Sequence, residues 1–142
     1  MLDNPRGIFV DTKLNLYVAD CLNRRIQFFV SGQSNGTTLM GSGSTQFTTL
    51  RCPNGVILDA DGHLFVAEHD LKRIIGWGPN GYQCVASCNN PSIFNSTLLA
   101  APYALSFDTY GNLYVVDSAS NRIEKFLIMN DDCGESCVVV FS

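Results

Sequence analysis

Three acid–arginine pairs are the residues of this sequence whose types and spacing best suit chemistry. In each pair the acid precedes the arginine by five residues, and the pairs are Asp20–Arg25, Glu68–Arg73 and Asp117–Arg122. A ring of such groups would offer acid–base catalysis. Because every unit of the chain repeats the pair, we instead interpret it as structural: across a hairpin, the two side chains satisfy each other's hydrogen bonds.

A second set of acids, Asp11, Asp59 and Asp108, stands where a short apolar run ends and a polar turn begins. An aspartate in that place commonly accepts hydrogen bonds from the amides of the turn. The alternative is a cation site, for which carboxylates from different strands must converge. Three units alone cannot show such convergence, and we expect no metal and no other cofactor.

The chain has two histidines, and neither has a partner at catalytic or metal-ligand spacing. His63 occupies the place that Asn15 and Asn112 hold in the other units, which indicates a turn residue. His69 lies in a later turn. The sequence also lacks a nucleophile elbow and a glycine-rich phosphate loop, so it supports no concrete enzyme mechanism.

These residues belong to an internal repeat. The segments 4–29, 52–77 and 101–126 align without a gap, and their prolines Pro5, Pro53 and Pro102 are 48 and 49 residues apart. Each unit reads as short runs of β-forming residues separated by turns, with no helical periodicity. The fourth run is less regular and is expected at 37–40, 82–86 and 137–141. Four antiparallel strands per unit of about 48 residues are typical of a β-propeller blade.

The repeated string resembles the NHL repeat. The best match begins at Asp108 and reads Asp-Thr-Tyr-Gly-Asn-Leu-Tyr-Val-Val-Asp, followed by Asn121-Arg122-Ile123. The resemblance covers three consecutive units, about 1–49, 50–98 and 99–142. It implies an all-β chain of about three four-stranded blades, part of a propeller that usually closes with six. It also implies a binding platform for proteins or, in some members, RNA, with no single activity.

Aromatic residues at two repeated positions are expected to pack between neighbouring blades. They are Tyr17, Phe65 and Tyr114 at one position, and Phe29, Trp77 and Phe126 at the other. Three blades leave two outer faces bare, because stacked repeats bury apolar surface only against their neighbours. We therefore expect further blades to come from the rest of the chain or from a second copy.

Six cysteines and two glycosylation sequons favour an extracellular protein or ectodomain. Cys84 with Cys88, and Cys133 with Cys137, have the same phase in two units, so each pair either bridges across a bend or stays reduced. Cys21 and Cys52 fall on one face of adjacent blades and could also pair. The sequons begin at Asn35 and Asn95. A cytoplasmic propeller with free thiols is the alternative.

The composition limits the class of partner that this chain is expected to bind. The 142 residues carry a net charge of −4 and no basic run, which disfavours RNA, and no apolar stretch approaches the ~18–20 residues of a membrane span. We expect a non-catalytic platform for a protein partner. The candidate contacts lie in the turns between the second and third strands: Leu22, Asn23, Arg24, His69, Asp70, Lys72, Ser118, Ser120 and Asn121.

Two other functions remain open. One is part of a propeller enzyme, similar to the peptide-amidating lyase or to calcium-dependent lactonases. The other is the substrate-recognition part of a tripartite-motif ubiquitin ligase, or of a similar ligase with a zinc-binding RING. The sequence shows no RING spacing of cysteines and histidines, so that catalytic domain would lie outside these residues.

Overall fold

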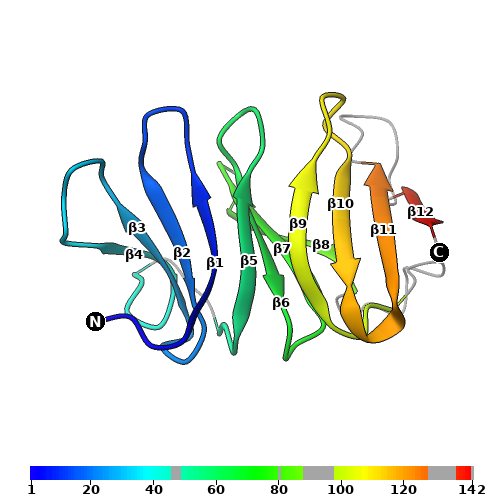
Figure 1. Cartoon of the computed structure of the whole chain (residues 1–142), viewed down its shortest axis with the longest axis horizontal. Coiled ribbons are helices and arrows are strands. Elements are labelled where there is room, and N and C mark those ends of the chain that lie inside the picture. The colour runs from blue at the N-terminus through cyan, green and yellow to red at the C-terminus, as the bar shows by residue number, and fades with distance from the viewer. Residues whose placement is uncertain (46–48, 80, 88–97, 128–136, 142) are drawn as a thin grey trace.

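The computed structural model describes residues 1–45, 49–79, 81–87, 98–127 and, for the backbone alone, 137–141. Its strands form three four-stranded antiparallel sheets that stand side by side (Figure 1). This is the all-β arrangement of propeller blades that the repeat predicts. Within the described residues, no helix has the length and apolar character needed to cross a membrane.

Each sheet is built from four strands in chain order, and we call the sheets blades 1, 2 and 3. Blade 1 holds β1 (Pro5–Val10), β2 (Leu16–Asp20), β3 (Arg25–Phe29) and β4 (Thr37–Gly41). Blade 2 holds β5 (Pro53–Leu58), β6 (Leu64–Glu68), β7 (Arg73–Gly78) and β8 (Gly81–Ala86). Blade 3 holds β9 (Pro102–Phe107), β10 (Leu113–Asp117), a 3₁₀ turn (Ser118–Ser120), β11 (Arg122–Leu127) and β12 (Cys137–Phe141).

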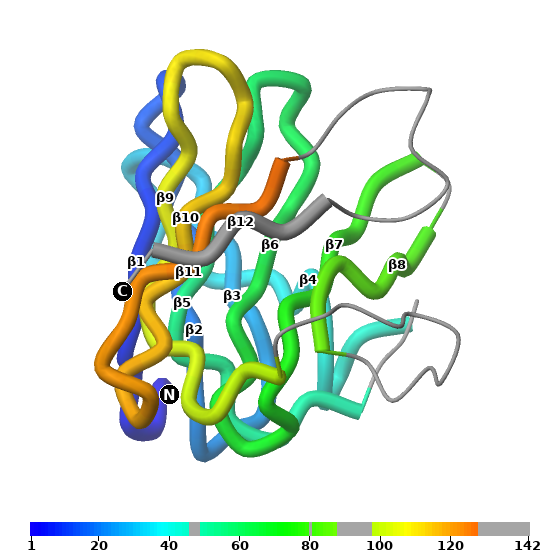
Figure 2. Tube along the Cα trace, turned by 90° about the vertical axis from the view of Figure 1, so that its right-hand side faces the viewer, coloured from blue at the N-terminus to red at the C-terminus, as the bar shows by residue number. Residues whose placement is uncertain are grey.

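The first strands of the blades lie next to one another, β1 against β5 and β5 against β9, while β4 and β8 lie on the opposite side of the molecule (Figures 1 and 2). The approach is closest at Gly7, where an added Cβ would lie 2.2 Å from the carbonyl oxygen of Asn54. A Cβ on Gly55 would lie 2.9 Å from the carbonyl oxygen of Tyr103. Glycine is therefore required where one first strand meets the next.

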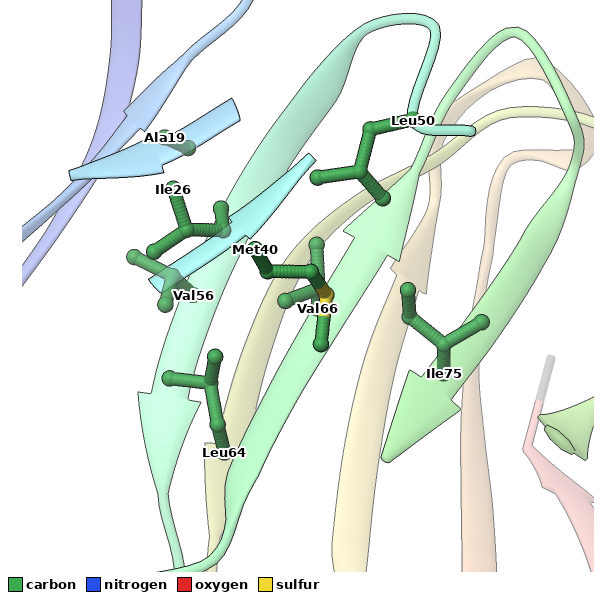
Figure 3. Close-up of a cluster of buried hydrophobic side chains, with 8 residues drawn as sticks. All are labelled: Ala19, Ile26, Met40, Leu50, Val56, Leu64, Val66 and Ile75. Atoms are coloured by element: carbon green, nitrogen blue, oxygen red, sulfur yellow. The ribbon is translucent and has the colours of Figure 1, made fainter. Parts of the chain in front are cut away.

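A buried apolar cluster fills the space between blades 1 and 2 (Figure 3). Its members are Ala19, Ile26 and Met40 from blade 1, with Leu50, Val56, Leu64, Val66 and Ile75 from blade 2 and the segment before it. A second cluster lies between blades 2 and 3 and includes Phe65, Ala67, Leu113, Val115 and Phe126. The interfaces between blades thus form the core, because a single sheet cannot bury its own faces.

The repeated aromatic residues divide between these interfaces and the outer faces. Four of them pack as expected: Tyr17 and Trp77 against the first cluster, and Phe65 and Phe126 within the second. Tyr114 is half-buried and lies on the face of blade 3 opposite to Leu113 and Val115, one of the two outer faces that three blades were expected to leave bare.

Phe29 is likewise not part of either interface. It pairs with Leu16, whose neighbour Tyr17 faces blade 2, so side-chain alternation turns Phe29 the other way. The repeat places each aromatic residue on a defined face of its blade. Among the described residues, no further blade covers the outer face of blade 1 or of blade 3.

Phe65 and Tyr114 occupy the same repeated position, so they test this assignment of faces. We expect Phe65→Ala to lower the free energy of unfolding by about 3–5 kcal/mol, the usual range for truncating a buried aromatic side chain. Tyr114→Ala, on the outer face, should cost roughly half of that or less, because it removes one hydrogen bond and a half-buried ring. Urea unfolding of both variants gives the comparison. Equal losses would place both rings in equivalent interfaces.

Candidate functional site

The acid of each repeated pair is fully buried at the centre of a small hydrogen-bonded cluster. In blade 1 the Asp20 carboxylate accepts hydrogen bonds from Arg25 Nε at 2.8 Å and from the backbone N–H of Asp3 at 2.7 Å. The Arg25 guanidinium also donates to the carbonyl oxygen of Met1 at 3.1 Å. The pair thereby ties the segment before β1 to the β2–β3 hairpin. We call this arrangement the blade clamp.

The clamp recurs in blade 2 with the same connections. Glu68 accepts hydrogen bonds from Arg73 Nε at 2.7 Å and from the backbone N–H of Arg51 at 2.8 Å. Arg73 in turn donates to the carbonyl oxygen of Thr49 at 3.3 Å. Here the tethered segment is the connection between blades 1 and 2, so the clamp sets where blade 2 begins.

Blade 3 repeats the pattern once more. Asp117 accepts hydrogen bonds from the backbone N–H groups of Ala100 and Ala101 and from Arg122 at 3.3 Å, and Arg122 donates to the carbonyl oxygen of Leu98. These acids and arginines are engaged in building the blades. The structural interpretation of the repeated pairs is confirmed.

The clamp keeps its aspartates ionised. Burial by itself would raise the pKa of Asp20, but the N–H of Asp3, the Arg25 guanidinium and the Asn23 carboxamide outweigh it and hold that pKa below its usual value. The pKa of Asp117 is lowered in the same way against its burial, chiefly by the N–H of Ala101. A carboxyl group held charged at neutral pH is poorly suited to act as a general acid.

The second set of repeated acids is also structural. Asp11 accepts hydrogen bonds from the backbone N–H groups of Lys13 and Asn15, both at 2.9 Å, and from the Asn15 carboxamide. Asp108 makes the equivalent bonds with Tyr110 and Asn112. The Asn112 carboxamide is the largest influence that holds the pKa of Asp108 below its usual value.

In blade 2 the corresponding turn contains a histidine in place of asparagine. His63 Nδ1 lies 2.9 Å from Asp59 Oδ2, and the ligand atoms of Asp59, Asp61 and His63 lie within 4.8 Å of one another. Such a group could hold a metal ion. The Asp59–His63 contact corresponds to the Asp11–Asn15 and Asp108–Asn112 turn bonds of blades 1 and 3, whereas Asp61 takes the place of Lys13 and Tyr110.

The predicted rim residues lie in the turns between the second and third strands, at the lower end of the blades in Figure 1. Some contribute to the clamps: the Asn23 carboxamide donates to Asp20, and Ser120 supports Asp117. His69 Nδ1 lies 3.0 Å from Asp70 Oδ1. The side chains that remain exposed differ from blade to blade: Leu22, Arg24, Asp70, Lys72, Ser118 and Asn121.

The structure brings Arg24 and Asp70 together with two residues that the sequence analysis missed. Arg6 and Arg51 line the same cleft of about 430 Å³ at the junction of blades 1 and 2. We call it the arginine cleft. Arg6 donates to Asn54 Oδ1 at 2.8 Å. The sequence did contain one indication of these two residues, because Arg6 and Arg51 lie at positions where the other units have no arginine.

A disulfide joins Cys21, in the β2–β3 turn, to Cys52, just before β5, and forms part of the wall of the arginine cleft. This pairing was one of the options that the sequence left open, and it is confirmed. Cys84 is also disulfide-bonded. Cys88 and Cys133 lie outside the described residues, as does the side chain of Cys137 in β12, so the two short pairings stay predictions.

The first glycosylation sequon is accessible, because Asn35 lies exposed in the connection between β3 and β4. Asn95, which begins the second sequon, lies outside the described residues.

Comparison with known proteins shows the fold of this chain but assigns it to no family. No family model matches the chain, and no curated protein does. Among solved structures, virginiamycin B lyase from Staphylococcus aureus in an inactive form with quinupristin has a TM-score of 0.65 at 17% identity, over 96% of this chain and 40% of that one. A candidate gluconolactonase has a TM-score of 0.70 at 18% identity, over 96% of this chain and 48% of that one.

A third similar structure is a complex of nidogen and laminin, with a TM-score of 0.65 at 25% identity, over 87% of this chain and 43% of that one. These neighbours are propellers, which confirms the propeller fold. The chain spans less than half the length of each of them.

The lowered pKa of Asp20 and Asp117 makes stability depend on acidity. A carboxyl group whose pKa is lower in the folded than in the unfolded chain, where it is about 3.9, stabilises the fold above that value. We expect the free energy of unfolding to fall as the pH drops below about 4 and through the folded pKa. Urea unfolding across pH 7 to 2.5 measures this decline.

Asp117→Asn isolates the contribution of one clamp. It should lower the free energy of unfolding at pH 7. It should also make the fall of that free energy with acidity shallower, because one carboxyl group whose protonation is linked to unfolding is gone. Asp61→Asn removes the same charge from an exposed turn position and serves as the control. An identical pH profile for the Asp117 variant and the unmodified chain would contradict the clamp.

The disulfide should stabilise the junction of blades 1 and 2. For a sequence separation of 31 residues, loss of the cross-link by Cys21→Ala together with Cys52→Ala is expected to cost about 3–4 kcal/mol. Urea unfolding measures the loss, and peptide mapping without reductant identifies the linkage. Alkylation of both thiols in the native, unreduced protein would contradict the pairing.

Proposed function

We propose that this chain is a non-catalytic segment of a propeller that serves as a binding platform for a protein partner. The supporting observation is that repeated residues build the blades, whereas variable residues remain exposed at one end of them. The repeated acids and arginines are used in clamps and turns, whereas the exposed side chains of the β2–β3, β6–β7 and β10–β11 turns differ in each blade. Variable exposed side chains on a rigid scaffold are typical of a recognition surface.

The contacts would come from one end of the blades. Leu22 and Arg24 of blade 1, Asp70 and Lys72 of blade 2, and Asn121 of blade 3 are exposed there. They combine an apolar side chain with both signs of charge. Such a mixed surface suits a protein better than a long polyanion, as does the net charge of −4. One similar structure is itself a complex of two proteins, nidogen and laminin.

An enzyme is the second candidate, because two similar structures carry the names of a lyase and a gluconolactonase. At 17–18% identity they indicate the fold alone. His63 contacts Asp59 in the β5–β6 turn, in the place that Asn15 and Asn112 take in the other blades. His69 contacts Asp70 in the β6–β7 turn. The platform therefore accounts better for the described residues.

We also propose that the platform is larger than these three blades, as in an NHL-type propeller of six. Val116 and Ile123 on the outer face of blade 3 are 38% and 48% exposed, more apolar surface than a closed ring would leave. The similar structures are about twice as long as this chain. Further blades, from the rest of the chain or from a second copy, would cover these faces.

The proposed setting is extracellular. The Cys21–Cys52 disulfide supports an oxidising compartment, and the exposed Asn35 is placed where a glycan could be attached. A partner would then be a secreted protein or the outer part of a membrane protein.

Site-specific photocrosslinking tests the platform. A photoreactive amino acid replaces Lys72, at the proposed end of the blades, or Ala60, an exposed residue of the β5–β6 turn at the other end. Incubated with extracellular proteins, the Lys72 variant should give specific protein adducts and the Ala60 variant few. Adducts at both positions alike, or none at either, would contradict the proposal. Hydrolysis of gluconolactone by the purified chain would favour the enzyme instead.

A further inference from the structure

The arginines of this chain fall into two groups. Three of the six belong to the blade clamps, where each meets a buried carboxylate and a backbone carbonyl. The other three, Arg6, Arg24 and Arg51, occupy positions at which no other unit has an arginine. All three line the arginine cleft. The blade architecture does not need them, since blade 3 is built without an arginine at any of these positions.

The guanidinium groups in the cleft retain free hydrogen-bond donors. Arg6 directs Nη1 to Asn54, which uses one of its five N–H groups. The guanidinium groups of Arg24 and Arg51 have no hydrogen bond or ion pair with any residue that the structure describes. Asp70 is the carboxylate that lines the cleft, and His69 already contacts it. Three positive charges thus face one negative charge.

The cleft is held in shape by bonds between the two blades. The Cys21–Cys52 disulfide fixes the turn that carries Arg24 relative to the segment that carries Arg51. The backbone N–H of Arg51 is held by Glu68, and Asn54, which positions Arg6, is 2% exposed. The arginines therefore project from backbone that is fixed before any ligand arrives, which lowers the entropy cost of binding.

Arg24 also adopts an uncommon backbone conformation. Its φ is +57°, in the left-handed region, where asparagine is tolerated better than arginine. Lys72 of blade 2 and Asn121 of blade 3 hold the equivalent position, each with φ of +52°. The left-handed turn is thus common to the three blades, and what distinguishes Arg24 is the arginine side chain at the lining of the cleft.

The surroundings of the cleft select among anions. Leu22, which is 60% exposed, lines the cleft beside the arginines and offers an apolar contact. Asp70 and the overall net charge of −4 oppose a long polyanion. Guanidinium groups bind carboxylates through paired hydrogen bonds. These features match one or two carboxylates next to an apolar side chain.

We propose that the arginine cleft is an anion-binding site that receives an acidic segment of a protein partner. The inference rests on the proposed platform function and makes it specific: the partner presents aspartate or glutamate beside an apolar residue. The carboxylates pair with Arg24, Arg51 and Arg6, and the apolar side chain packs on Leu22.

The test uses a capped peptide, acetyl-Gly-Glu-Leu-Glu-Gly-amide, and its counterpart with glutamine in place of both glutamates. Binding to the folded chain is followed by nuclear magnetic resonance titration, which also locates the site through the arginine Nε–H signals. We expect the acidic peptide to shift the signals of Arg6, Arg24 and Arg51. The glutamine peptide and the variant Arg24→Gln/Arg51→Gln should each weaken binding by about tenfold or more.

Lys13→Gln removes a positive charge from the β1–β2 turn at the other end of blade 1 and serves as the control, with affinity expected within about twofold of the unmodified chain. Equal binding by the unmodified chain and the double arginine variant would overturn the inference. So would equal binding of the two peptides. Binding of a heparin-derived oligosaccharide at the arginines, without binding of the acidic peptide, would overturn it in favour of a sulfated glycan.

The two proposals fail in different ways. If the acidic peptide ignores the arginines while Lys72 still crosslinks to proteins, the platform stands and the cleft assignment is wrong. If the peptide binds at the arginines while Lys72 gives no protein adducts, the cleft binds carboxylates and the wider platform is wrong.

Discussion

A buried carboxylate that is fully hydrogen-bonded is the interaction on which this structure depends. An ionised group inside a protein is tolerated only where partners replace its lost water, and each clamp acid has an arginine and at least one backbone N–H. The arginine extends the network to a carbonyl oxygen of the preceding segment. The position of each first strand is therefore fixed relative to its own hairpin. That placement allows the close approach of Gly7 to Asn54 and the packing of the two cores.

Much of the fold could be predicted because the repeat reports the same position three times. Runs of β-forming residues between turns predicted four strands in each of the three units, and the fourth strand of the third unit was expected at 137–141, where β12 lies. The Cys21–Cys52 bridge was one of the pairings that the sequence left open, because the two residues were expected on one face of adjacent blades. Phe29 and Tyr114 lie outside both interfaces for a physical reason. Periodicity predicts the face on which a side chain lies but not whether another blade covers that face.

The candidate site was less accessible to sequence analysis. A repeat alignment gives weight to what the units share, and Arg6 and Arg51 are residues that they do not share. Arg6 and Arg51 lie close to Arg24 only because of the way blade 2 packs against blade 1. The clamp of Glu68 and the Cys21–Cys52 disulfide help to fix that packing. The shared residues are explained by architecture. The residues peculiar to one junction are consequently where recognition is best sought.

The clamps also bear on how such a chain acquires its structure. Their bonds join residues 5 to 24 positions apart, within a blade and the segment that leads into it. The first strands of neighbouring blades meet across about 48 positions. Closing a short loop costs less entropy than closing a long one. Each blade can therefore form locally and then dock on the blade made before it, a nearest-neighbour order suited to a polypeptide emerging from the ribosome one unit at a time.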